Sequence, residues 1–297
     1  MEDYNKAPFT YEQHLSLLKS RGLIIDNPDE AITFLKQVNY YRLTAYCIPF
    51  QNPHDVFCPN TNFETLVQLY RMDEELRNKV FGMLVPIEIF LRTQLAYELA
   101  NTWGAFAHYN PAIFKNTEDH QLWLADLEAD IIDAKEVFIE HYKEKYNDFP
   151  RLPLWMACEV MHMGRLSCFY SYLTLNARQK ISEQIGIDHN VFKTWIHNLC
   201  YVRNICAHHG RLWNRNLTIR SLIPYKEPLW LSINLNNKKL FTSIATAEWI
   251  YRKIGLPLSY IEDVHASMKN IASLDPRFSA MMGIPDDRGI GMCWVVG

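Results

Sequence analysis

Apolar residues in this 297-residue chain recur at helical spacing, and no stretch alternates apolar and polar residues for more than a few positions. Alternation is typical of a half-buried strand, whereas a spacing of about three to four residues is typical of an amphipathic helix. The chain also has no tandem repeat and no low-complexity tract. The sequence therefore predicts an all-α protein.

Start and stop signals mark the first helices. A helix is predicted over residues 10–21, where Thr10 and Gln13 form a capping box. A second helix begins at the Asp26–Pro28 triplet, because proline suits a first helical turn. The proline-rich stretch 48–60 is predicted to be a loop and a subdomain boundary.

Two consecutive helices are predicted after this loop. Thr61 and Glu64 have the spacing of a second capping box. The helical pattern then covers residues 62–81 and 83–103. Pro86 predicts a boundary or a kink between them, because proline removes a backbone hydrogen bond and clashes with the preceding turn.

A largely apolar helix is predicted over residues 154–173. We expect its large apolar side chains to belong to the core and not to a cofactor site. These side chains are Trp155, Met156, Val160 and Met163.

A further helix starts near residue 189, and Gly210 is its predicted terminator. These signals together predict three parts. They are an N-terminal helical subdomain over 1–60, a helical core over 61–226, and C-terminal helices over 227–297 with a loose tail beyond Pro276.

Positive charge is concentrated in one segment, which we call the basic island and define as residues 189–226. It contains no Asp or Glu, although the whole chain has a net charge of -3. A local concentration of cations is what a phosphate-bearing ligand needs. The basic and imidazole side chains of the island are Lys193, Arg203, Arg211, Arg215, Arg220, Lys226, His189, His197, His208 and His209.

Arg203 and His208 lie near the end of the predicted helix. Their separation corresponds to a rotation of about 140°, so the side chains flank a shared edge and do not stack on one face. Imidazole exchanges protons near neutral pH, and a guanidinium holds a phosphate and its developing charge. One chain then supplies half a site for RNA cleavage, which a second copy completes. Asn204 is predicted to orient His208 or the phosphate.

The remaining predicted site residues keep two interpretations each. Trp213 is either a core residue or a stacking surface. His209 is either a helper or structural donor, or a second catalyst. Glu88 and Arg92 form a helical pair that is either structural or orients an active-site arginine. The aromatic stretch Asn39–Tyr46 is either a hydrogen-bonded core or a surface for bases. The predicted RNA-binding residues are His209, Arg211, Arg215, Trp213, Arg220, Lys193 and Arg42, of which Arg211 and Arg215 are otherwise surface charges.

Metal, cofactor and membrane sites are not expected. The island has no carboxylate cluster for magnesium, and Cys206, His208 and His209 lack the spacing of a zinc site. The seven cysteines form no Cys-x-x-Cys pair, which favours reduced thiols. The polar first residues lack the apolar core of a signal peptide, and no run of about 18 apolar residues occurs. We therefore expect a cytoplasmic protein that does not cross a membrane.

The segment Arg203–Arg215 resembles the signature of the Abi-like phage abortive-infection proteins of bacteria, of the AbiD and AbiF type. The resemblance runs in order over roughly residues 8–220. It also includes Pro8–Thr10, Arg21–Leu23, Asn39–Leu43, Phe63–Glu64, Leu69–Tyr70, Leu76–Arg77, Ile87–Ile89, Leu91–Thr93, Leu152–Met156 and Glu159–Val160.

That family is placed in the HEPN superfamily of helical bundles, whose motif is Arg-x4–6-His with a polar residue after the Arg. Arg203, Asn204 and His208 match it. The resemblance implies a metal-independent endoribonuclease with a composite site across two HEPN units, leaving 2',3'-cyclic phosphate ends. It further implies a role in antiphage defence, control by a small structured RNA antitoxin, and kinship with RNA-guided CRISPR ribonucleases.

The chain departs from the family pattern at two places. It has a single Arg-x4-His, so a composite site requires a homodimer. Its ending, Asp286–Gly297, does not resemble the usual family ending. Gly210–Leu212 follow the motif, where HEPN proteins paired with nucleotidyltransferases continue to a Tyr. Two other functions stay open, a non-catalytic RNA-binding module and a helical scaffold for protein interactions.

Overall fold

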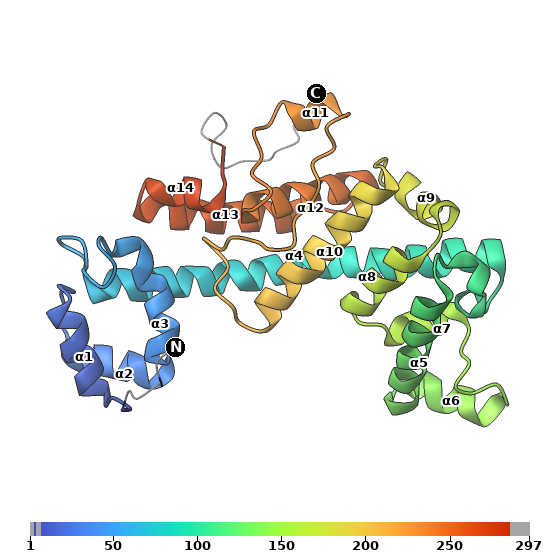
Figure 1. Ribbon diagram of the computed structural model, residues 1–297, viewed down its shortest axis with the longest axis horizontal. Helices are drawn as coiled ribbons and strands as arrows, with labels where there is room; N and C mark the ends of the chain where they lie inside the picture. Colours follow the sequence, from blue (N-terminus) through green and yellow to red (C-terminus); the bar gives the residue numbers. More distant parts are fainter. Residues whose placement is uncertain (1–2, 4–6, 286–297) are drawn as a thin grey trace.

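The computed structural model describes residue 3 and residues 7–285, and these contain helices and no strand. The all-α prediction is confirmed. Figure 1 shows one long helix, α4 (Phe63–Trp103), running through the middle of the molecule. The other helices gather around it, with α1–α3 at one end and α5–α7 at the other.

The N-terminal helices begin where their capping residues predict. Thr10 Oγ1 accepts from the Gln13 backbone N–H, and Gln13 Oε1 accepts from that of Thr10. The Asn27 side chain caps the second helix at the Glu30 backbone N–H. Both predicted starts are therefore confirmed. The helices of this end are α1 (Tyr11–Ser20), α2 (Pro28–Gln37), α3 (Tyr40–Cys47) and the short η1 (Ile48–Phe50).

The two helices predicted around Pro86 are one continuous helix, α4. Pro86 leaves the carbonyl four residues earlier without its helical donor. Helices α12 (Leu240–Ile254) and α13 (Ser259–Leu274) pack on α4, and the Tyr251 hydroxyl donates to the neighbouring Met83 carbonyl at 2.7 Å. Tertiary contacts thus support the backbone where proline weakens it. The predicted cap was also wrong, because Asn62 and not Thr61 accepts from the first turn, at the Thr65 backbone N–H.

The single helix predicted over 154–173 is two helices. Met161 adopts an extended conformation, and the His162 side chain caps the second helix at the Arg165 backbone N–H. Trp155, predicted to be in the core, is 51% exposed, whereas Met163 is buried as expected. The helices of this end are α5 (Thr117–Asp133), α6 (Val137–Lys145), α7 (Leu154–Val160), α8 (Met163–Tyr172) and α9 (Leu175–Glu183), with η2 (Ala107–Tyr109) and η3 (Pro111–Ile113) before them.

Helix α10 (His189–Ala207) carries the motif and crosses α4 (Figure 1). Its end is a Schellman turn, in which the His209 N–H reaches the Cys206 carbonyl and the Gly210 N–H reaches that of Ile205. His209 takes the left-handed position with φ 56°, so the predicted terminator Gly210 is off by one residue. Space is instead tight at Gly210, since an added Cβ would lie 3.2 Å from side-chain atoms of Ile205 and Arg215, which would have to shift slightly.

The C-terminal helices cover the upper side of α4 in Figure 1. They are α11 (Pro228–Leu231), α12 (Leu240–Ile254), α13 (Ser259–Leu274) and α14 (Arg277–Met282). The prediction of a loose tail beyond Pro276 fails for α14, because Phe278 is buried against Trp213 at 4.5 Å between ring centroids. The Asp286–Gly297 ending lies outside the described residues.

Helix α4 is long and apolar enough to cross a membrane, with a mean hydropathy of 1.3 in its most apolar window. It is the only such helix among the described residues. Helices α7, α10, α12 and α13 pack against it, and it carries the buried charges Asp73 and Arg77. Of its most apolar window, 33% is buried in the molecule, so these contacts cover part of the helix.

Candidate functional site at the end of α10

The three motif residues lie at the carboxyl end of α10. Arg203 and Asn204 are in its last turns, and His208 is its C-cap residue. Asn204 and His208 are exposed, and the Arg203 side chain is 30% exposed. None of the three is sealed in the apolar interior, so a substrate can reach them.

Arg203 lines a small hollow of about 260 Å³ against α4. Its Nε lies 3.8 Å from Glu88 Oε2 without a hydrogen bond, and its guanidinium lies 5.3 Å from the centroid of the Phe81 ring. Val85 and Ile89 form the exposed part of the same hollow. The arginine is therefore positioned by a carboxylate and an aromatic ring and still faces an open space.

A chain of charges connects Arg203 to the break between α7 and α8. Arg92 donates to the Cys158 carbonyl at 2.9 Å and to the Met161 carbonyl at 3.1 Å, where a cation favourably caps the end of α7. Its Nη2 lies 3.4 Å from Glu88 Oε1. Glu88 thus lies between a structural arginine and the motif arginine. The structural interpretation agrees with these contacts, and the orienting of an active-site arginine stays a prediction.

Asn204 lies beside the arginine. Its Oδ1 accepts from Arg203 Nη1 at 3.4 Å, and its Nδ2 lies 3.9 Å from Cys200 Sγ. The described contacts connect Asn204 to Arg203 and not to the His208 ring. An orienting role toward the arginine is the one that the geometry favours.

The turn after His208 is held by one buried carboxylate, Asp73. It accepts from the Trp213 backbone N–H at 2.8 Å and from that of Leu212 at 3.2 Å. It also accepts from the Tyr46 hydroxyl at 2.6 Å and from Arg77 Nη1 at 2.6 Å. Three separate segments of the chain therefore meet at this carboxylate.

Charge and burial oppose each other at this cluster. Burial raises the pKa of the Asp73 carboxyl, while Arg77 and the other donors act to lower it. Burial and the neighbouring Asp73 also raise the pKa of the Tyr46 phenol. With donors at every contact and Arg77 at 2.6 Å, the cluster is an ion pair that a neutral phenol completes.

The predicted RNA-binding residues do not all face solvent. Trp213 is 0% exposed and packs on Phe278, so the stacking interpretation is wrong because the loop carries this ring into the core. Arg211 donates to the Ala45 carbonyl, and Arg42 donates to the His209 carbonyl. Both arginines therefore also tie the motif turn to α3.

The other predicted RNA-binding residues stay at the surface. Arg215 is half-buried and donates to the Arg211 carbonyl at 3.3 Å. Lys193 is half-buried, while His209 and Arg220 are exposed. These side chains leave positive charge on the outside of the island.

Sequence reasoning missed the cluster around Asp73, and a signal for it was present. Asp73 falls on the same helical stripe as Leu66, Leu69, Leu76 and Val80, all of which are buried. A carboxylate on an apolar stripe, four residues before Arg77, indicates a buried pair.

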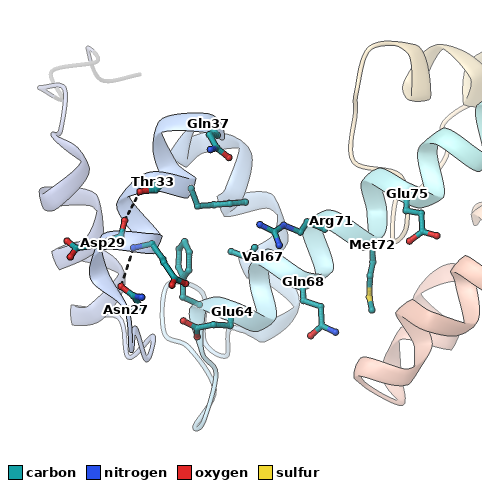
Figure 2. A pocket seen from close by; sticks show the side chains of 13 residues that line it. Asn27, Asp29, Thr33, Gln37, Glu64, Val67, Gln68, Arg71, Met72 and Glu75 are labelled. Carbon is teal, nitrogen blue, oxygen red and sulfur yellow. Dashed lines mark hydrogen bonds between the residues drawn. The ribbon is translucent and has the colours of Figure 1, made fainter.

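A separate hollow of about 800 Å³ lies between α2 and the start of α4 (Figure 2). It contains none of the motif residues. Its charged lining residues are Asp29, Glu30, Glu64 and Glu75 against the single Arg71. This excess of carboxylates repels a phosphate backbone and makes the hollow unsuitable for RNA.

Comparison with known proteins gives one match. The family model described as Abi-like protein matches residues 33–214, which is more than half of the chain. We found no match among curated proteins and none among solved structures. Within the described residues, no group of three or more His, Cys, Asp or Glu side chains is placed to hold a metal ion.

Proposed function

The chain belongs to the Abi-like protein family, and from this premise we propose that it is a metal-independent endoribonuclease of the HEPN type that acts in abortive infection. The observation that carries the proposal is the accessible helix end. There Arg203 is held by Glu88 at 3.8 Å beside an open hollow, and His208 is exposed one turn further on.

These groups support RNA cleavage by transesterification. One His208 imidazole accepts the proton of the 2'-hydroxyl, whose oxygen attacks the adjacent phosphorus. The bond to the 5'-oxygen breaks, and a second imidazole donates a proton to that oxygen. Arg203 stabilises the charge that grows on the phosphate. The products are a 2',3'-cyclic phosphate and a 5'-hydroxyl.

A second copy of the chain completes this site, because one chain supplies a single histidine of the motif. Val85 and Ile89 are exposed apolar side chains on the same hollow as Arg203. Apolar residues at the rim of an incomplete site suit contact between two protomers. We therefore propose a homodimer that pairs the two helix ends.

The direct test is to incubate purified protein with mixed RNA in EDTA. We expect fragments with 2',3'-cyclic phosphate ends. Intact RNA after long incubation at high protein concentration contradicts the proposal.

The resemblance extends the proposal to the cytoplasm as the place of action and to a small structured RNA as the antitoxin. Sequencing of the RNA that co-purifies with the protein tests the antitoxin.

Replacing Ile89 with Asp is expected to weaken the dimer and to lower the cleavage rate in proportion to the fraction of dimer that remains. Ile89 is 52% exposed, so a carboxylate there leaves the folded monomer intact but must be desolvated in the interface. Sedimentation and RNA cleavage are measured together. Ile132→Asp, at an equally exposed isoleucine of α5, is the control. A dimer that persists in Ile89→Asp places the interface elsewhere.

Replacing Glu88 with Gln is expected to lower the cleavage rate about tenfold. A 1 Å misplacement of a catalytic group costs roughly 10²-fold, and we expect Arg203 to shift by less than that. The change removes the charge that positions Arg203 and keeps the side-chain shape. Glu159→Gln is the matched control, because Glu159 lies 3.9 Å from Arg92 and is mostly exposed. Cleavage rates are compared at equal thermal stability, and equal losses in both variants reject a positioning role.

A further inference from the structure

A pocket of about 960 Å³ lies among the N-terminal segment, α1, α3 and the loop after η1, and nothing so far assigns it a ligand. We propose that it binds an unpaired nucleobase of single-stranded RNA. The inference rests on the proposed function, since it names a feature of the substrate that the same protein cuts.

Aromatic rings form one wall of the pocket. The rings of His14 and Tyr40 are stacked, with 4.0 Å between their centroids and an interplanar angle of 12°. The centroid of the Phe9 ring lies 5.6 Å from that of His14. Tyr41 is 84% exposed. A base adds one more ring to such a surface, and stacking on aromatic side chains is how proteins hold unpaired bases.

The pocket also offers polar groups for a base edge. Arg21 donates to the Tyr40 hydroxyl at 3.3 Å and pairs with Asp55 at 3.0 Å. Asp55 is the single carboxylate among its described lining residues, so that pairing leaves no net negative charge. His14 Nδ1 is buried without a hydrogen-bond partner in the described structure, and burial lowers the pKa of this imidazole.

Helix α3 connects this pocket to the motif. Its Tyr40, Tyr41 and Thr44 line the pocket. The opposite side of the helix receives the motif turn, through the contacts of Arg42 with the His209 carbonyl and of Arg211 with the Ala45 carbonyl. The two sites lie on opposite sides of α3, and a helix is about 10–12 Å across. A single-stranded RNA that is cut at His208 therefore reaches the pocket within a few nucleotides.

The aromatic stretch predicted from the sequence therefore divides into two parts. Tyr46 is buried and donates to Asp73, as the core interpretation requires. Tyr41 stands outside, as the base-binding interpretation requires. The two tyrosines serve different roles because their separation on α3 corresponds to a rotation of about 140°, so their side chains point to different sides of the helix.

The test measures binding of labelled single-stranded RNA to the full chain carrying His208→Ala, which prevents cleavage. Adding Tyr41→Ala is expected to raise the Kd by roughly 5- to 150-fold, the effect of losing the stacking of one base. Tyr41→Phe keeps the ring and is expected to bind as tightly as the parent. Tyr146→Ala is the control, because this exposed tyrosine is the C-cap residue of α6, a helix at the other end of the molecule from α3 (Figure 1).

The outcomes separate this proposal from the proposed function. An unchanged Kd in Tyr41→Ala, or the absence of any RNA binding, overturns the base pocket. Cleavage by the chain carrying Tyr41→Ala alone, at unchanged KM and cut sites, overturns it as well and leaves the nuclease standing. Tyr41-dependent binding of RNA that the wild-type protein never cuts supports the pocket and rejects the nuclease.

Discussion

His208→Ala is expected to lower RNA cleavage by roughly 10²- to 10⁴-fold, the usual contribution of general acid–base catalysis. In the proposed dimer each protomer contributes one His208, so a single substitution removes both proton-transfer groups from the site. Because the side chain is exposed at the end of α10, its loss leaves the core unchanged. RNA binding, which depends on the remaining positive charge, is expected to persist.

The matched control is His197→Ala, which removes an exposed histidine of the same helix outside the motif. Initial rates on one labelled RNA are compared in EDTA, together with thermal unfolding of each variant. Equal cleavage by wild type and His208→Ala removes this residue from the mechanism. RNA bound by both proteins without cleavage supports a non-catalytic RNA-binding module.

The fold class and the position of the motif were predictable because they depend on local patterns. Thr10 and Asn27 mark helix starts through contacts within one turn, and both predictions are confirmed. The apolar spacing also predicts α10 with the motif at its carboxyl end, where the structure has Arg203 and His208. Such features need only the nearest neighbours in sequence.

Two of the errors occur where distant contacts decide the outcome. Pro86 does not break α4, because α12 and α13 pack on this helix and Tyr251 of α12 donates to the Met83 carbonyl near the proline. Trp213 is in the core because Phe278 of α14, 65 residues later, packs against it. This burial removes Trp213 from the residues predicted to bind RNA. Neither contact has a signature near the residue itself.

Asp73→Ala is expected to destabilise the protein by about 3–5 kcal/mol, the cost of breaking one buried ion pair from one side. The substitution leaves Arg77, 3% exposed, without its counter-charge. It also leaves the Leu212 and Trp213 backbone N–H groups and the Tyr46 hydroxyl without their acceptor. Urea unfolding followed by circular dichroism measures the loss.

Glu75→Ala is the control for losing a carboxylate from the same helix. Glu75 is half exposed and pairs with Lys79 at 2.6 Å, and such surface pairs contribute at most about 1 kcal/mol. A loss below this value in Asp73→Ala shows that the carboxylate does not hold the structure together.

Asp73→Asn separates the charge from the hydrogen bonds. Asparagine keeps one acceptor for the Trp213 N–H but removes the charge that Arg77 requires, so we expect a smaller loss of stability than with alanine. The turn after His208 still loosens, because the asparagine oxygen cannot satisfy every donor at once. A folded Asp73→Asn protein that binds RNA but cuts it more slowly would show that a carboxylate outside the motif holds the histidine in place.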